Sequence, residues 1–231
     1  MNSKDKNLIR KIIQKNSVNK SKYFYPLLDN AFSKEDLIAG IKVLISSQIT
    51  MSKKTTNFEK EFARKLGKKY ALMVNSGSSA NLLAAFASGN PLRKNHFKPG
   101  DEVLIPAICW STSLWPLVQS GLKPVFVDVD KDTLNVNADL LIKKITNKTK
   151  VIMLVHVLGN STNVEKIKKI AQRKKIILIE DTCESLGTKF KNKYLGTFGD
   201  FGTYSFYYSH QITSGEGGMI VCDTQEDYEL L

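Results

Sequence analysis

Hydrophobic and polar positions along the chain form two kinds of segment. In one kind, apolar residues recur three and four positions apart, as on one face of a helix; these segments lie at 33–45, 56–66, 79–87, 138–145 and 164–173. The other kind is a short apolar run, found at 70–74, 103–107, 124–129, 151–158, 176–179, 202–208 and 219–222. The alternation of the two predicts an α/β protein.

The apolar runs are continuous, which is typical of strands buried on both faces. We therefore expect a mainly parallel sheet flanked by helices. The last two runs follow each other without a helical segment between them, so part of the sheet should be mixed. Two capping signals support the helix boundaries. Ser33 and Asp36 have the spacing of a capping box, and Thr224 precedes a final helical segment.

Composition narrows the class of protein. A chain of 231 residues with 42% hydrophobic and 24% charged residues is typical of one large globular domain. It contains no apolar run of 18 residues, and its N-terminus lacks the apolar core of a signal peptide. We therefore expect no membrane partner and a cytoplasmic location. Cys109, Cys183 and Cys222 are widely spaced, which predicts buried free thiols and neither a disulfide framework nor a zinc site.

The net charge of +12 is unevenly distributed. Residues 1–22 hold seven Lys or Arg and one Asp, and we expect them to form a basic, loosely attached arm before a large domain at 23–231. Much of the remaining positive charge alternates with apolar positions in 164–175, as on the solvated face of a helix. This pattern predicts no nucleic-acid partner. Binding of an anionic small ligand by some of these positive charges stays an open alternative.

The candidate chemistry lies where predicted strands end, because ligands of α/β sheets bind outside the carboxyl ends of strands. The segment NSGSSANLLAA, residues 75–85, joins a strand end to a helix start. Backbone N–H groups near Gly77 and Ser78 would there form a cradle for an anion such as phosphate. A simple capped turn is the alternative.

Two further strand ends carry polar or aromatic residues. Asp181 and Glu184 follow the run at 176–179; a carboxylate there can pair with a protonated ring nitrogen, bind a metal or cap a helix. Trp110 follows the run at 103–107, where an indole can stack on a planar ligand or pack in the core.

The stretch SFYYSHQITSGEGG, residues 205–218, adds two more candidates. Ser205 can offer a hydroxyl to a phosphate, and His210 follows at an expected strand end. The glycines after it permit close backbone approach and positive φ. His210 is either an active-site residue or a packing residue of the core.

The order of these motifs resembles the sugar aminotransferase family, fold-type I enzymes that use pyridoxal 5'-phosphate on nucleotide-linked keto-sugars. The resemblance runs from about residue 23 to the end. It rests on NSGSSANLLA, KPGDEVLIPA, PVFVDVD, VHVLGN, IEDTCESLG, GTFGDFGTYSF and GEGG. It implies the PLP-binding large domain of that fold, a homodimer, and a C-terminal small domain that this sequence lacks.

Residue roles follow from the same resemblance. Gly77, Ser78 and Ser205 match the ligands of the cofactor phosphate. Trp110 matches the residue stacked on the pyridine ring, and Asp181 the carboxylate that keeps the ring nitrogen protonated. Glu184 falls near the ring hydroxyl, where aminotransferases of the family usually place Gln.

His210 is the main departure from the family pattern, since the aminotransferases carry Lys at this position. An imidazole cannot form a stable Schiff base with an aldehyde, but it can transfer protons near neutral pH. In this the chain resembles the 3-dehydratases of the family, which make 3,6-dideoxysugars, and most of all those of the colitose pathway of lipopolysaccharide O-antigen synthesis.

That resemblance implies removal of the C3 hydroxyl of a nucleotide-linked 4-keto-6-deoxyhexose. The cofactor would be pyridoxal or pyridoxamine 5'-phosphate, with His210 as the proton-transfer group and glutamate as the amino donor. Two alternatives stay open: an aminotransferase that uses another lysine, such as Lys193, and a cofactor-binding chain without activity. The nucleotide, the hexose and a need for an iron–sulfur cluster also stay open.

Overall fold

A computed structural model describes residues 3–16, 24–26, 28 and 31–231. The chain divides into two compact units, Met1–Phe58 and Glu59–Leu231, with the division inside helix α3, Lys53–Leu66. The boundary predicted between residues 22 and 23 lies outside the described residues. Within the described part of the chain, no helix has the length and apolar character to cross a membrane.

The first unit contains helices α1, Ser3–Asn16, and α2, Lys34–Ile45. The predicted capping box of α2 is confirmed: the backbone N–H of Asp36 donates to Ser33 Oγ at 3.1 Å, and that of Ser33 donates to the Asp36 carboxylate at 2.9 Å. Helix α1 occupies most of the segment that we expected to be a loose arm.

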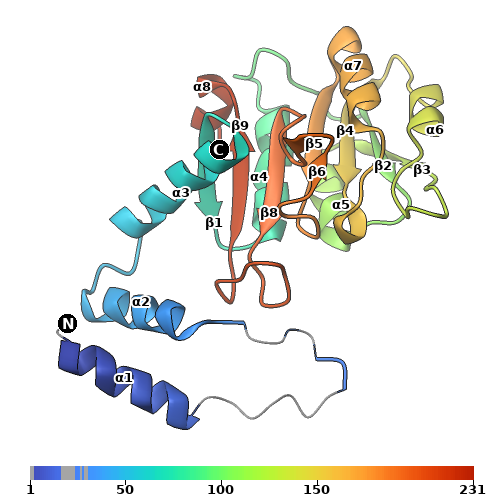
Figure 1. The fold of residues 1–231 in the computed structure, drawn as a ribbon. Coiled ribbons are helices and arrows are strands. Elements are labelled where there is room, and N and C mark those ends of the chain that lie inside the picture. Colours follow the sequence, from blue (N-terminus) through green and yellow to red (C-terminus); the bar gives the residue numbers. More distant parts are fainter. Residues whose placement is uncertain (1–2, 17–23, 27, 29–30) are drawn as a thin grey trace. The chain divides into compact units, whose positions relative to one another are not determined.

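The second unit is built on a seven-stranded sheet of order β1-β9-β8-β5-β4-β2-β3 (Figure 1). Its strands are β1 Tyr70–Val74, β2 Glu102–Pro106, β3 Lys123–Val127, β4 Thr149–Val155, β5 Ile177–Asp181, β8 Phe201–Ser205 and β9 Gly218–Cys222. The five strands from β8 to β3 are parallel, while β9 is antiparallel to β8 and to β1. The predicted mainly parallel, mixed sheet is therefore confirmed.

Helices cover both faces of this sheet. They are the C-terminal part of α3, which contributes Ala63 and Leu66 to the core over β8 and β9, and α4 Gly77–Gly89, α5 Ser111–Gln119, α6 Ala138–Lys143, α7 Val164–Lys174 and α8 Gln225–Glu229. The connections include a short 3₁₀ turn at Val157–Gly159 and a hairpin of β6 Lys189–Phe190 and β7 Lys193–Tyr194. Alternate residues of β4 face opposite cores: Met153 lies in the cluster with Ala84 of α4, and Ile152 in the cluster with Ile167 of α7. This double burial accounts for the continuous apolar runs in the sequence.

The last parallel strand ends earlier than its aromatic sequence suggests. We expected a strand over 202–208, but β8 ends at Ser205, whose partner Gly218 begins β9. The intervening loop is closed where the N–H of Phe206 donates to the Gly217 carbonyl at 2.8 Å. His210 consequently lies in a loop and not at a strand end. The reason is that the returning chain leaves the antiparallel ladder before Gly218: Gly215 and Gly217 have positive φ, and Phe206 and Tyr207 contact Ser214 and Gly215 in a loop.

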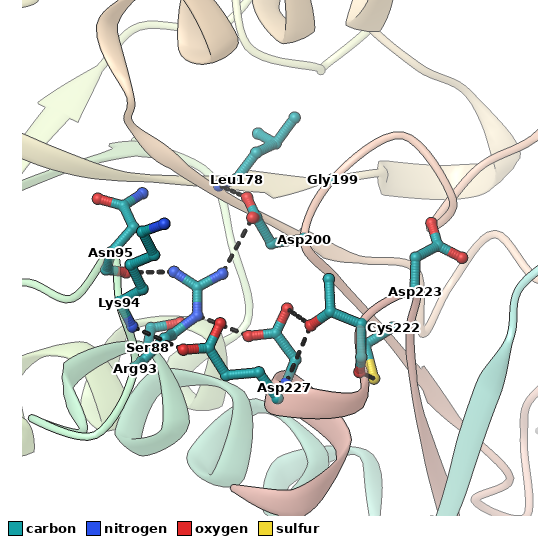
Figure 2. Close-up of polar contacts among 12 residues, drawn as sticks. Ser88, Arg93, Lys94, Asn95, Leu178, Gly199, Asp200, Cys222, Asp223 and Asp227 are labelled. Atoms are coloured by element: carbon teal, nitrogen blue, oxygen red, sulfur yellow. Dashed lines mark hydrogen bonds and ion pairs between the residues drawn. The ribbon is translucent and has the colours of Figure 1, made fainter.

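A buried guanidinium joins three segments near the amino ends of β5 and β8 (Figure 2). Arg93 Nε donates to Asp227 of α8 at 2.6 Å, and Nη2 donates to Asp200 at 3.0 Å. Nη1 donates to the Asn95 carbonyl. The other oxygen of Asp200 accepts from the N–H of Leu178 in β5 at 2.8 Å. These contacts fix α8 and the loop after α4 against the sheet.

Candidate active site

A cavity of about 510 Å³ opens at the carboxyl ends of β4, β5 and β8, at the end of the sheet opposite the Arg93 cluster. All seven residues singled out from the sequence line it, namely Gly77, Ser78, Trp110, Asp181, Glu184, Ser205 and His210. The structure thus brings together residues that are up to 133 positions apart in the chain (210 − 77). Their individual roles remain predictions.

One end of the cavity is formed by two helix N-termini. Gly77 and Ser78 occupy the first turn of α4, whose N–H groups have no acceptor within the helix. The hydroxyl of Ser78 donates to Thr112 Oγ1 in the first turn of α5 at 3.1 Å. Both helices direct their positive dipole ends to this place, which suits a bound anion.

Glycine is required at two positions of this end. A Cβ at residue 77 would lie 2.7 Å from Ser205 Cβ and 2.8 Å from Cys183 Sγ. At residue 218, a Cβ would lie 2.2 Å from the carbonyl oxygen of Ser76. The glycines therefore allow β8 and β9 to approach the turn that starts α4. Ser205 Oγ accepts from the N–H of Tyr207 at 3.2 Å, which leaves its own O–H to donate.

The buried carboxylate of Asp181 is held by three donors. Its Oδ2 accepts from Asn81 Nδ2 and from Ser113 Oγ, both at 2.7 Å, and its Oδ1 accepts from the N–H of Cys183 at 3.1 Å. Asn81 and Ser113 were not predicted from the sequence as site residues. For Asn81 a signal existed, because it is a polar residue within the apolar pattern of 79–87.

His210 lies half-buried in the loop after β8, with its ring edge-on to Tyr207 at 6.0 Å between centroids. Burial lowers the pKa of His210, and the negative charges of Glu184 and Asp181 oppose this in part. The neutral imidazole is therefore favoured at neutral pH, as a proton acceptor requires. Glu184 itself accepts from the N–H of Leu158 at 3.3 Å.

Trp110 is at the N-cap position of α5, and 68% of it is exposed. The indole therefore stands at the cavity and outside the main core, which removes core packing as its role. Among the cavity-lining residues that the structure describes there is no lysine, and Lys193 lies on the hairpin strand β7.

The neighbouring acid Glu180 belongs to the fold and not to the cavity. Its carboxylate contacts His156 Nε2 at 3.0 Å and accepts from the N–H groups of Gly196, Phe198 and Gly199 at 2.6–2.9 Å. Burial raises the pKa of Glu180, but His156 and the backbone donors outweigh burial and lower it overall. His156, in the VHVLGN segment of the sequence, thus supports this loop and does not line the cavity.

The three cysteines are free thiols, as predicted, but only Cys222 is fully buried. Cys183 lines the cavity, and Cys109 lies half-buried between β2 and α5. Burial raises the pKa of both thiols. In the described residues, no group of three or more His, Cys, Asp or Glu side chains is arranged to hold a metal ion.

The sheet order and the cavity at its carboxyl ends define a protein with the large-domain fold of PLP-dependent transferases. Residues 31–231 match the model of the DegT/DnrJ/EryC1/StrS aminotransferase family, and the chain belongs to this family.

Among its relatives is GDP-4-keto-6-deoxy-D-mannose 3-dehydratase of Escherichia coli O55:H7, which is 45% identical over 207 residues. The alignment covers 90% of this chain and 53% of the relative. A dTDP-4-dehydro-2,6-dideoxy-D-glucose 3-dehydratase of Saccharopolyspora spinosa is 42% identical over 193 residues, covering 83% of this chain and 42% of that protein. The chain thus spans about half the length of the curated relatives it matches.

Solved structures give the same result. An E. coli GDP-4-keto-6-deoxy-D-mannose-3-dehydratase with bound hydrated PLP matches with a TM-score of 0.86 at 45% identity, covering 90% of this chain and 53% of that one. A GDP-4-keto-6-deoxymannose-3-dehydratase with a trapped PLP-glutamate geminal diamine matches with a TM-score of 0.85 at 44% identity, covering 89% and 53%.

Proposed function

We propose that this protein removes the C3 hydroxyl of a nucleotide-linked 4-keto-6-deoxyhexose, with pyridoxal or pyridoxamine 5'-phosphate as its cofactor. One observation carries the proposal. The imidazole of His210 lines the same cavity as an anion-binding helix end, a buried carboxylate and an exposed indole, and no described residue of that cavity is a lysine. This combination favours proton transfer over covalent attachment of the cofactor.

The cavity fits such a cofactor. Its volume of about 510 Å³ is within the usual range for ligand sites. The position where residue 77 would carry a Cβ is close to Ser205, and Gly77, Ser78 and Ser205 all line the cavity. These three residues would hold the phosphate. Trp110 would stack on the ring, and Asp181 would hold the proton of the ring nitrogen. When bound, the cofactor supplies a ring that takes up negative charge formed at carbon.

The chain's own groups would do the following work. One nitrogen of the His210 imidazole takes up a proton and then delivers it to the departing C3 hydroxyl. The same group thus serves first as base and then as acid. Its lowered pKa keeps the acceptor form available at neutral pH. The carboxylate of Glu184 places a negative charge near this imidazole, which favours its protonated form. Two helix N-termini neutralise the phosphate, which positions the reacting end of the ligand.

The relatives favour a GDP-linked hexose, because those at 45% and 43% identity bear the name GDP-4-keto-6-deoxy-D-mannose 3-dehydratase. We propose glutamate as the amino donor, since a solved relative holds a PLP-glutamate adduct. The product would enter dideoxysugar synthesis for a lipopolysaccharide O-antigen. Homodimer formation is part of the proposal as well: neighbouring helices α4 and α5 expose Leu82, Phe86, Trp115 and Val118.

The test compares the protein with its His210→Asn variant. Each is incubated with pyridoxal 5'-phosphate, glutamate and GDP-4-keto-6-deoxymannose, and the sugar products are identified by mass spectrometry. We expect C3 deoxygenation to fall by roughly 10²–10⁴-fold in the variant, while the dissociation constant for the cofactor changes only a few-fold. His96→Asn, outside the cavity, is the matched control. Undiminished dehydration by His210→Asn would rule out the proposed mechanism.

A further inference from the structure

A buried chain of hydrogen bonds links Asp181 to two helices and a neighbouring strand. Thr203 Oγ1 of β8 donates to Asn81 Oδ1 of α4 at 2.6 Å, and Asn81 Nδ2 donates to Asp181 Oδ2 at 2.7 Å. Ser113 Oγ of α5 donates to the same carboxylate oxygen at 2.7 Å. All four side chains are at most 4% exposed. These four side chains are thus largely shielded from solvent, and Asn81 and Asp181 face the cavity.

In this chain of hydrogen bonds, donation runs in one direction, from Thr203 through Asn81 to Asp181. An ionised carboxylate only accepts, so Asn81 must turn its amino group toward Asp181 and its oxygen toward Thr203. The Thr203 hydroxyl has a single proton to donate, and Asn81 Oδ1 at 2.6 Å is closer than the alternative acceptor, the Glu180 carbonyl at 3.4 Å. Asn81 Nδ2 also donates to the Thr112 carbonyl at 3.3 Å, so Thr203 supports from the oxygen side the amide orientation that Asp181 and Thr112 fix from the nitrogen side.

We propose that Asn81, Ser113 and Thr203 are positioning residues that orient Asp181 toward the ring nitrogen of the cofactor. This inference rests on the proposed function. Asp181 is on β5, and the three partners are on α4, α5 and β8. Since α4 and α5 also form the anion-binding end through Ser78 and Thr112, the same two helices fix the distance between the phosphate and the carboxylate.

The geometry makes Thr203 the most informative position. Thr203→Val keeps the shape of the side chain and removes the hydroxyl, so Asn81 Oδ1 loses its donor while Nδ2 keeps its acceptors on Asp181 and on the Thr112 carbonyl. The buried Asn81 oxygen without a donor would loosen the amide and weaken its hold on the Asp181 carboxylate. Thr203→Ser keeps the hydroxyl and is the matched control. Ser113→Ala removes a different donor to the same oxygen.

The test uses the protein loaded with pyridoxal 5'-phosphate that carries ¹⁵N in its ring. The ¹⁵N chemical shift is followed against pH, and the cofactor dissociation constant is measured by fluorescence titration. For Thr203→Val and for Ser113→Ala we expect the ring nitrogen to lose its proton about one pH unit lower than in the unmodified protein, with affinity about tenfold weaker. Thr203→Ser should behave as the unmodified protein does.

Asp181→Asn separates the two proposals. If the unmodified protein does not bind the cofactor, or if its ring nitrogen titrates as in Asp181→Asn, the proposed function itself fails. The other outcome is that Asp181→Asn lowers the pKa of the ring nitrogen, while this pKa in Thr203→Val and Ser113→Ala equals or exceeds that in the unmodified protein. In that case only the positioning role is refuted. Circular dichroism confirms that each variant is folded, and Ser113→Ala decides the matter if Thr203→Val is not.

Discussion

The surroundings of His210 set the equilibrium between its neutral imidazole and its imidazolium form. Desolvation disfavours the imidazolium in the loop after β8, while the carboxylates of Glu184 and Asp181 favour it. Burial is the larger effect, so the pKa of His210 is lowered from its ordinary value of 6.5. A residue in this state accepts a proton at neutral pH and is a strong enough acid to return it, which the proposed reaction needs.

This balance can be measured at the residue itself. We expect the imidazole resonances of His210, assigned with His210→Asn, to titrate with a midpoint below pH 6.5. In Glu184→Gln the midpoint should move lower still, because the substitution removes a negative charge that raises the pKa of His210. Glu216→Gln removes another carboxylate of the cavity and should leave the midpoint in place. A midpoint that rises in Glu184→Gln would contradict this account.

Residues at strand ends could be predicted from the sequence, whereas their supports could not. Asp181 and Ser205 are the last residues of β5 and β8, and a strand end is visible as the point where an apolar run stops. Thr203 and Ser113 have no such signal, since a threonine within a strand and a serine early in a helix are ordinary. Only the fold shows that they meet through Asp181 and Asn81.

At the scale of elements, the site is assembled from strand ends and helix starts. The predicted strands at 70–74 and 219–222 match β1 and β9 to within one residue, because a buried strand is a continuous apolar run in the sequence. Helix α5 was not predicted: it has only nine residues and contains Pro116. Its position behind Trp110 is nevertheless what brings Thr112 to the cavity and Ser113 to the carboxylate of Asp181.

The loop between β8 and β9 was a further error, and the strand predicted over 151–158 likewise ends early, at Val155, before the 3₁₀ turn. The aromatic residues of the loop after β8 have high strand propensity, but the ladder ends where Ser205 pairs with Gly218. Tertiary pairing therefore overrides local propensity. The consequence is functional, since a loop lets His210 turn into the cavity beside Tyr207.

At the scale of the second unit, the cavity depends on a sheet that is fixed at its opposite end. Arg93 lies buried between Asp227 and Asp200 and also stands over the Phe201 ring at 5.6 Å. It thus connects the loop after α4, the start of β8 and helix α8. Loss of this guanidinium would leave two carboxylates facing each other without a counter-charge.

We expect Arg93→Ala to lower the free energy of unfolding by about 3–5 kcal/mol, as for a broken buried ion pair. Urea denaturation followed by circular dichroism measures it. Arg64→Ala breaks an exposed pair with Glu61 in the same unit and should leave the urea midpoint nearly unchanged. Equal effects of the two substitutions would show that the Arg93 cluster does not hold the unit together.

In the proposed site, the cavity presents the imidazole of His210 where the aminotransferases of the family would present a primary amine to the cofactor. Borohydride reduction of the protein with one equivalent of pyridoxal 5'-phosphate, followed by peptide mapping by mass spectrometry, tests this arrangement most directly. We expect no reduced adduct in the cavity of the unmodified protein, and a stoichiometric adduct at position 210 in His210→Lys. A stoichiometric adduct on a native lysine of the unmodified protein, Lys193 for example, would contradict it.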